Sequence, residues 1–203
     1  VKDRSDFELV LGRTLVPRSM QAAIPKSLPV LECMLAYVAW FNERVCGDPS
    51  SPYSGYSLTL RDILSWARFI VESRQANKEL GLWEAYCHGA CLMHLDGLGL
   101  GTGLALEDSS SVRTKAEAVL LDQVPQGNTV SNLGGADESF ETQNSGKFGA
   151  FPFYITVGPL SIPEARFNMA APTTSLNTFR VLRAMQLRKP VLLEGSPGVG
   201  KTR

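Results

Sequence analysis

Apolar residues recur with a helical period in four stretches of the first 122 residues. In 28–45 they fall at positions 28, 31, 35, 38, 41 and 45, and in the next stretch at 60, 63, 64, 67, 70 and 71. Weaker patterns of the same kind cover about 82–95 and 109–122. Because residues three and four apart share one face of an α-helix, these stretches predict four amphipathic helices in a small bundle.

The segments between these helices contain residues that interrupt helices. GDPSSPYSGY (47–56) separates the first two helices, and either Ser57 or Thr59 can cap the second one. DGLGLGTG (96–103) follows the third, with glycine at alternate positions. This run follows a helix rather than a strand and lacks the G-x-G-x-x-G spacing, so a helix end opening into a glycine loop is favoured over a dinucleotide site.

The chain changes character after residue 122. Residues 123–147 are polar and poor in aliphatic side chains, which predicts a flexible linker. FPFYITVG (151–158) then predicts a strand, and 171–189 predict a helix with its N-cap at Thr173, Thr174 or Ser175. Its apolar face consists of Leu176, Phe179, Leu182 and Met185. Pro190 ends this helix, and VLLE (191–194) predicts a short buried strand.

These patterns predict four parts: a connector over 1–27, a helical unit over 28–122, a linker over 123–147 and an α/β segment over 148–203. The fold class is therefore mainly α with a minor α/β part. The α/β part is expected to run strand, helix, strand and glycine loop.

Composition narrows the possible functions. The 203 residues carry 20 basic and 20 acidic side chains, so no overall field draws the chain to nucleic acid or to an anionic membrane. No apolar stretch has the length of a membrane helix. The first residues contain no hydrophobic signal core and no initiator Met. We therefore expect an intracellular protein, with no membrane contact and no direct nucleic-acid site, that is a piece of a longer chain.

Two cysteines form the one arrangement that suggests a metal. Cys87, Cys91 and His94 share a face of the third predicted helix, with His88 beside them. Their spacing matches no common zinc pattern. Small buried thiols on the apolar side of a helix are the favoured interpretation.

The strongest chemical signal is VLLEGSPGVGKT (191–202). Its glycines let the backbone wrap around phosphates, Lys201 neutralises the outer phosphates, and the Thr202 hydroxyl holds Mg²⁺. The preceding strand fixes where the loop begins. The pattern predicts a phosphate-binding loop for ATP and Mg²⁺, with nucleotide-binding residues Gly195, Ser196, Pro197, Gly198, Val199, Gly200, Lys201 and Thr202.

Two parts of an ATPase site do not occur in these 203 residues. No helix follows Thr202, and no apolar strand ending in Asp-Glu supplies a second Mg²⁺ ligand. We therefore do not expect this segment to hydrolyse ATP by itself.

Several stretches together resemble the midasin family of dynein-related AAA+ ATPases. PVLLEGSPGVGKT (190–202), with the helix before it, resembles the start of an AAA+ module. SLTLRDILSWARFI (57–70) resembles a lid helix of the same family, and AYCHGACLMHLDGLGLGTG (85–103) resembles the segment that follows it. FGAFPFYITVGP (148–159) resembles the opening of the next module. The resemblance implies a chain that spans the lid of one module and the Walker A start of the next.

This resemblance also implies a function. Midasin-like proteins carry six AAA+ modules and use ATP to strip assembly factors from precursors of the large ribosomal subunit (pre-60S particles). They do so in the nucleolus and nucleoplasm. The implied partners are those particles, their assembly factors and the other modules of the same chain. Arg61 matches the position of a lid sensor arginine, which adds positive charge at the terminal phosphate.

Two alternatives remain open on the sequence. The chain could be a non-enzymatic helical interaction module with a vestigial phosphate loop, whose helices at 28–45 and 57–71 bind a partner. Less favoured is a different P-loop enzyme such as a small kinase, because a long helical region precedes the loop here.

Overall fold

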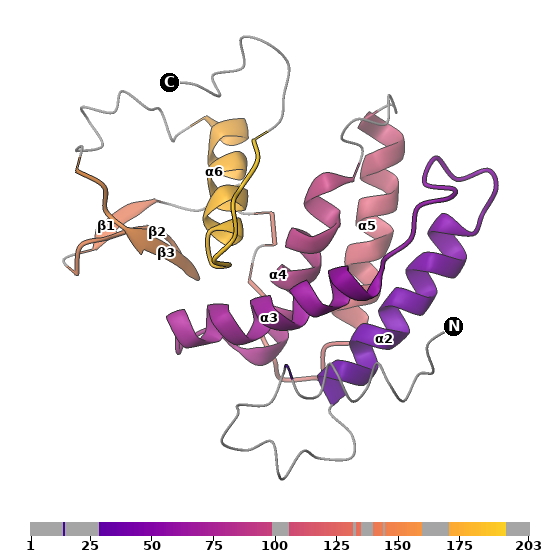
Figure 1. Ribbon diagram of the computed structural model, residues 1–203, viewed down its shortest axis with the longest axis horizontal. Coiled ribbons are helices and arrows are strands. Elements are labelled where there is room, and N and C mark those ends of the chain that lie inside the picture. The colour runs from indigo at the N-terminus through magenta and orange to yellow at the C-terminus, as the bar shows by residue number, and fades with distance from the viewer. Residues whose placement is uncertain are drawn as a thin grey trace. The chain divides into compact units, whose positions relative to one another are not determined.

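The computed structural model describes residue 14 and residues 29–98, 106–131, 133–134, 140–143, 145–159 and 171–193. The chain divides into two compact units, residues 1–134 and 135–203, with the division inside the predicted linker. The first unit is helical in its described part, and the second combines a three-stranded sheet with a helix (Figure 1). The predicted fold class, mainly α with a smaller α/β part, is confirmed.

All four predicted helices of the first unit are present. They are α2 (Pro29–Phe41), α3 (Leu60–Ala76), α4 (Leu82–Met93) and α5 (Leu106–Asp122). The contact between α3 and α4 is the most extensive, and α5 packs on both α2 and α4. The apolar faces of the helices therefore bury one another, as their period predicts.

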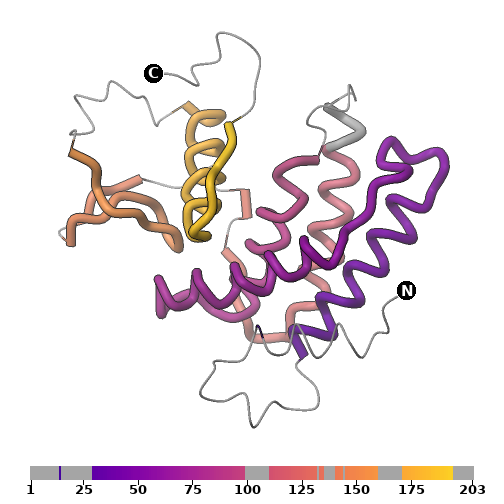
Figure 2. Tube along the Cα trace, viewed as in Figure 1, coloured from indigo at the N-terminus to yellow at the C-terminus, as the bar shows by residue number. Residues whose placement is uncertain are grey.

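The end of α2 is irregular. The helix continues into a π-helical turn, η2 (Asn42–Cys46), which fits one more residue into the turn than an α-helix does. Val45 and Cys46 are buried there, so the apolar pattern that reaches residue 45 is kept. Figure 2 shows the trace leaving this turn, looping outward and returning to enter α3.

A capping box fixes the start of α3. Thr59 is the N-cap, and the Asp62 carboxylate accepts hydrogen bonds from the Thr59 backbone N–H at 2.8 Å and from its hydroxyl at 2.7 Å. These contacts satisfy donors that the first helical turn would otherwise leave unpaired. Of the two candidate caps in the sequence, Thr59 is the one used.

Aromatic side chains form the centre of the helical unit. The Trp66 ring stacks on Tyr86 with centroids 4.9 Å apart and meets the Tyr37 ring edge-on at 5.7 Å. Trp66 Nε1 donates to the Tyr86 carbonyl at 2.8 Å. Gly89 on α4 faces this indole, and a Cβ there would lie 2.4 Å from Trp66 Cδ1. The close contact of α3 with α4 therefore depends on a glycine.

The segment after α5 is attached to the helices. We call residues 123–134 the strap. Gln123 Oε1 accepts a hydrogen bond from the Tyr86 hydroxyl at 2.5 Å, and the Ser131 N–H and hydroxyl both donate to Glu84 Oε1. Leu133 is buried. The first half of the predicted linker therefore lies against the first unit.

The second unit contains an antiparallel sheet of β1 (Glu141–Gln143), β2 (Lys147–Ala150) and β3 (Phe153–Thr156), in that order. α6 (Pro172–Ala184) packs on β2 and β3, with the Phe153 and Phe179 rings 5.5 Å apart. The strand predicted at 151–158 corresponds to β3. The sequence did not predict β1 and β2, because both are short and lack a clear apolar alternation, and β2 contains a glycine.

The N-cap of helix α6 lies earlier than predicted, and the helix ends at Ala184 rather than just before Pro190. Its N-cap is Ala171 and Pro172 occupies the first turn, so the predicted N-cap at Thr173, Thr174 or Ser175 is wrong. Proline suits this position because its φ is already helical and the missing N–H has no partner to lose. Phe179 and Leu182 are buried as expected, whereas Met185, at the end of the helix, is 48% exposed.

The predicted buried strand at 191–194 is not seen in its described part. Residues 191–193 have no strand pairing, and Val191, Leu192 and Leu193 are 42%, 80% and 53% exposed. A buried strand needs neighbours on both edges and layers on both faces. None of the three described strands pairs with 191–193, so the apolar sequence lacks the partners that would make it a strand.

Candidate nucleotide site

The predicted phosphate loop, Gly195–Thr202, lies outside the described residues. The roles of Lys201, of Thr202 as the Mg²⁺-side hydroxyl, and of the loop glycines therefore stay predictions. The structure describes the approach to that loop: α6, the turn that follows it, Pro190 and residues 191–193.

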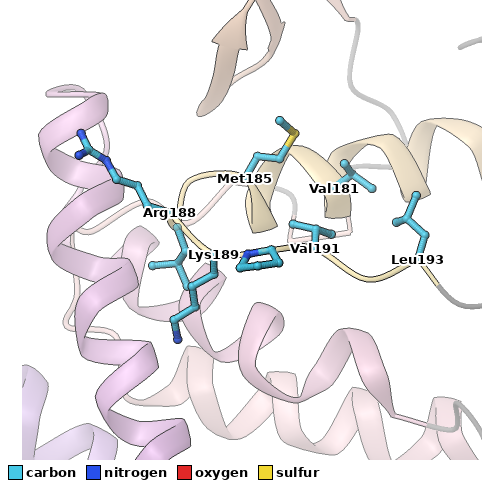
Figure 3. Close-up of a pocket in the computed structure, with 8 residues that line it drawn as sticks. Val181, Met185, Arg188, Lys189, Val191 and Leu193 are labelled. Atoms are coloured by element: carbon cyan, nitrogen blue, oxygen red, sulfur yellow. The ribbon is translucent and has the colours of Figure 1, made fainter.

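A groove lies along this approach (Figure 3). Its volume is about 510 Å³. Apolar side chains line most of it, and in Figure 3 Arg188 and Lys189 lie at one end while Val181 and Leu193 lie at the other. This surface suits an apolar group. The lining residues are Val181, Met185, Leu187, Arg188, Lys189, Pro190, Val191 and Leu193.

Arg61 is described, and it lies in the first turn of α3 with an exposed side chain. Within the described part of the chain it makes no ion pair. The neighbouring carboxylate, Asp62, is engaged by Thr59. A cation in the first turn of a helix opposes the helix dipole, so stability alone does not explain an arginine there.

A contact near Arg61, between Asn42 and Leu58, was not predicted from the sequence. The Leu58 N–H donates to Asn42 Oδ1 at 2.8 Å, and Asn42 Nδ2 donates to the Leu58 carbonyl at 3.2 Å. Leu58 immediately precedes the N-cap of α3. The only sign of this contact in the sequence was Asn42 at the end of the apolar face of the first predicted helix. Polar residues are common at helix ends, so this sign did not indicate a contact with Leu58.

The cysteine and histidine group of α4 is buried in the core. Cys87 and Cys91 are inaccessible to solvent, and burial raises the pKa of Cys87 to about 12. The His94 ring packs on Phe41 and shares a 2.7 Å hydrogen bond, through Nε2, with the Tyr37 hydroxyl. In the part of the chain that the structure describes, no three Cys, His, Asp or Glu side chains are grouped to hold a metal ion. The favoured interpretation of buried thiols is confirmed.

Burial of His94 predicts a pH-dependent stability. Desolvation lowers the pKa of His94 from 6.5 to about 3, with Arg113 lowering it further and Asp62 opposing the shift. Between these values the unfolded chain binds a proton that the folded chain excludes. The free energy of unfolding therefore falls by about 1.4 kcal/mol per pH unit from this group as the pH drops below 6.5.

Urea unfolding of the 203-residue chain measures this effect. All three tryptophans, Trp40, Trp66 and Trp83, belong to the first unit, so their fluorescence reports on that unit alone. Other groups also titrate, so the informative quantity is the difference in slope between the natural chain and His94→Gln. Equal slopes for the two proteins would contradict the prediction.

The glycine run is described only at its start. Leu95–Gly97 form a 3₁₀ turn, η3, directly after α4, and residues 99–103 lie outside the described part. Arg113 Nη1 on α5 donates to the Leu95 carbonyl at 2.9 Å and pairs with Asp96 at 3.3 Å. A helix therefore ends at the run, as predicted, and an ion pair fixes that end to α5.

Among the described helices, none combines the length and the apolar character that crossing a lipid bilayer requires.

Comparison with known proteins finds relatives among the midasins. The chain is 38% identical over 159 residues to midasin of Dictyostelium discoideum, which covers 71% of this chain and 3% of the relative. It is 50% identical over 36 residues to midasin of Giardia intestinalis, covering 18% of this chain and 1% of that protein. The chain thus spans a few per cent of the length of these relatives. No family profile matches it, and no solved structure matches it.

Proposed function

The chain belongs to the midasin family as a fragment of a midasin-like protein, and on this premise we propose that it is part of an AAA+ ATPase. The helical unit is the lid of one module. The second unit begins the next module and carries its phosphate loop. The protein binds and hydrolyses ATP to release assembly factors from pre-60S ribosomal particles, for their maturation and nuclear export.

One observation gives the proposal most of its support. The glycine–lysine–threonine pattern of a phosphate loop and the SLTLRD start of α3 occur together in a chain that aligns with midasin over 159 residues. A phosphate loop alone indicates only a P-loop protein. The exposed arginine in that α3 start makes no ion pair with a described residue, and it gives further support because a cation there is unfavourable for the helix itself.

In this proposal the groups have separate tasks. The backbone of Gly195–Gly200 cradles the phosphates of ATP, Lys201 neutralises the outer phosphates, and Thr202 holds Mg²⁺. Arg61 supplies positive charge at the terminal phosphate as the phosphoryl group transfers. Arg61 and Lys201 belong to different modules, so they need not act on the same nucleotide.

The proposed setting follows from the same premise. The protein acts in the nucleolus and nucleoplasm, and its partners are pre-60S particles, their assembly factors and the other AAA+ modules of its own chain. The described helices and the balanced charge give no support for contact with a membrane or for a direct nucleic-acid site.

The alternative of a helical interaction module has weaker support. It requires the apolar faces of 28–45 and 57–71 to be exposed for a partner. In the structure these faces are buried inside the unit; the buried side chains include Met34, Phe41, Ile63, Trp66 and Ile70.

Replacing Arg61 by alanine tests the proposed site in the longer protein. We expect kcat for ATP hydrolysis to fall by about 10-fold to 100-fold, since one charge that stabilises the transition state is lost. The unfolding midpoint should stay unchanged or rise slightly, because Arg61 is exposed, makes no ion pair with a described residue and opposes the helix dipole.

Arg68→Ala is the matched control. Arg68 is also exposed on α3, two turns further along the helix. It should leave both kcat and stability unchanged. An Arg61 variant with natural turnover would refute the sensor role, and one that unfolds would make Arg61 a structural residue.

A further inference from the structure

The two residues before α3, which leads to Arg61, are fixed by hydrogen bonds from side chains on both sides. On one side, Asn42 binds both the N–H and the carbonyl of Leu58. On the other side, Asp62 binds the backbone and the hydroxyl of Thr59. Together these contacts fix the two residues that precede α3. The orientation of the first turn of α3 is therefore fixed as well.

Asn42 acts from a different helix and from an unusual backbone position. It is the first residue of the π-helical turn η2 at the end of α2, sixteen positions before Leu58. Its amide replaces the pairing that a neighbouring strand would give to Leu58, with one donor and one acceptor. π-Helical turns are frequent at functional sites because the extra residue redirects side chains.

The loop between η2 and α3 is buried at Tyr53 and largely exposed elsewhere. Residues 47–57 are turns and bends, and most of their side chains are exposed. The two bonds from Asn42 cross this loop at its base and connect α2 directly to the entry of α3. Figure 2 shows the same course: the chain loops out and returns.

We propose that Asn42 is a positioning residue, which sets the location of the Arg61 guanidinium by tying the start of α3 to α2. The inference rests on the proposed role of Arg61. A charge that meets a phosphoryl group loses much of its effect when it is misplaced by about 1 Å, so the support of its backbone matters. In this proposal Asn42 acts through the backbone at the start of α3 and not on the nucleotide itself.

A double-mutant cycle in the longer protein tests the inference. Asn42→Ala should lower kcat for ATP by about fivefold, a typical coupling for residues in one network, while KM changes little. In an Arg61→Ala background, the same Asn42 substitution should have no further effect on kcat. Asn42→Asp keeps an acceptor for the Leu58 N–H and should restore part of the lost kcat.

Asn77→Ala is the matched control. Asn77 is the C-cap at the opposite end of α3, and its side chain accepts the Glu79 N–H at 3.0 Å. Losing this contact weakens the same helix far from Arg61, so kcat should stay at the natural value. Hydrogen exchange gives a second measurement: the Leu58 amide should exchange faster in Asn42→Ala and at the natural rate in Asn77→Ala.

The outcomes separate this inference from the proposed function. Equal losses of kcat from Asn42→Ala with and without Arg61 would show that Asn42 acts on something else, and would overturn the inference alone. Natural kcat in Asn42→Ala, with fast exchange at Leu58, would also overturn it. If Arg61→Ala itself has natural kcat, the sensor role fails and the inference fails with it.

Discussion

Replacing Lys201 by alanine in the longer protein is expected to weaken ATP binding at this module by roughly 10-fold to 100-fold or more. In the proposed site the Lys201 ammonium group is the cation that neutralises the outer phosphates. Without it, backbone N–H groups must hold a multiply charged ligand alone. The substitution removes one charge and adds no bulk, so we expect the protein to fold as before.

The measurement has to separate this module from any other nucleotide site. Photolabelling with an azido analogue of ATP, followed by mass spectrometry of peptides from residues 190–203, reports on this loop alone. Lys147→Ala is the matched control, because Lys147 is an exposed lysine on β2 of the same unit. Labelling that stays at the natural level in Lys201→Ala would refute the phosphate-loop assignment and remove the main support for an ATPase.

Gly89→Ala is expected to destabilise the helical unit by roughly 2–3 kcal/mol. Helix propensity alone would predict the opposite, a gain in stability. Alanine inside a helix is favoured over glycine by about 1 kcal/mol. Here the new Cβ would lie 2.4 Å from Trp66 Cδ1 and 2.7 Å from Trp66 Nε1. The indole has little freedom to withdraw, because it is 2% exposed and its N–H is bonded to Tyr86.

Urea unfolding followed by tryptophan fluorescence measures this effect in the 203-residue chain. Gly97→Ala is the control, since a Cβ at Gly97 meets no atom of the described residues within 4 Å. It should shift stability by less than about 0.5 kcal/mol. A stabilised Gly89→Ala variant would show that α3 and α4 separate easily, and that the packing of Trp66 against α4 is looser than the structure indicates.

The helices could be predicted from the sequence because their signal is long and local. Leu60 to Val71 repeats an apolar face over three turns, and Thr59 and Asp62 mark where that helix begins. The short strands gave no such signal. β1 pairs with β2 through ETQ and KFGA, which contain little apolar alternation, and their pairing becomes visible only when the chain folds back.

In the candidate site, too, only the residues that belong to local motifs could be predicted from the sequence. The roles proposed for Lys201, Thr202 and Arg61 come from motifs that are contiguous in sequence. Asn42 could not be found in that way, because its partner is Leu58, beyond an irregular loop, and its function depends on the direction of both chains. The apolar stretch at 191–193 failed as a predicted strand because a strand depends on partners that its own residues do not specify.

The strap has a consequence for how much its length can vary. Gln123 and Ser131 both bind residues of α4, namely Tyr86 and Glu84, which lie two positions apart on one helix. The seven residues between Gln123 and Ser131 therefore form a loop whose two ends are both bound to α4. An insertion or a deletion there has to bulge outward or release an anchor, whereas residues 48–52 lie in an exposed turn. Across related proteins, the chain should vary in length before α3 and keep its length after α5.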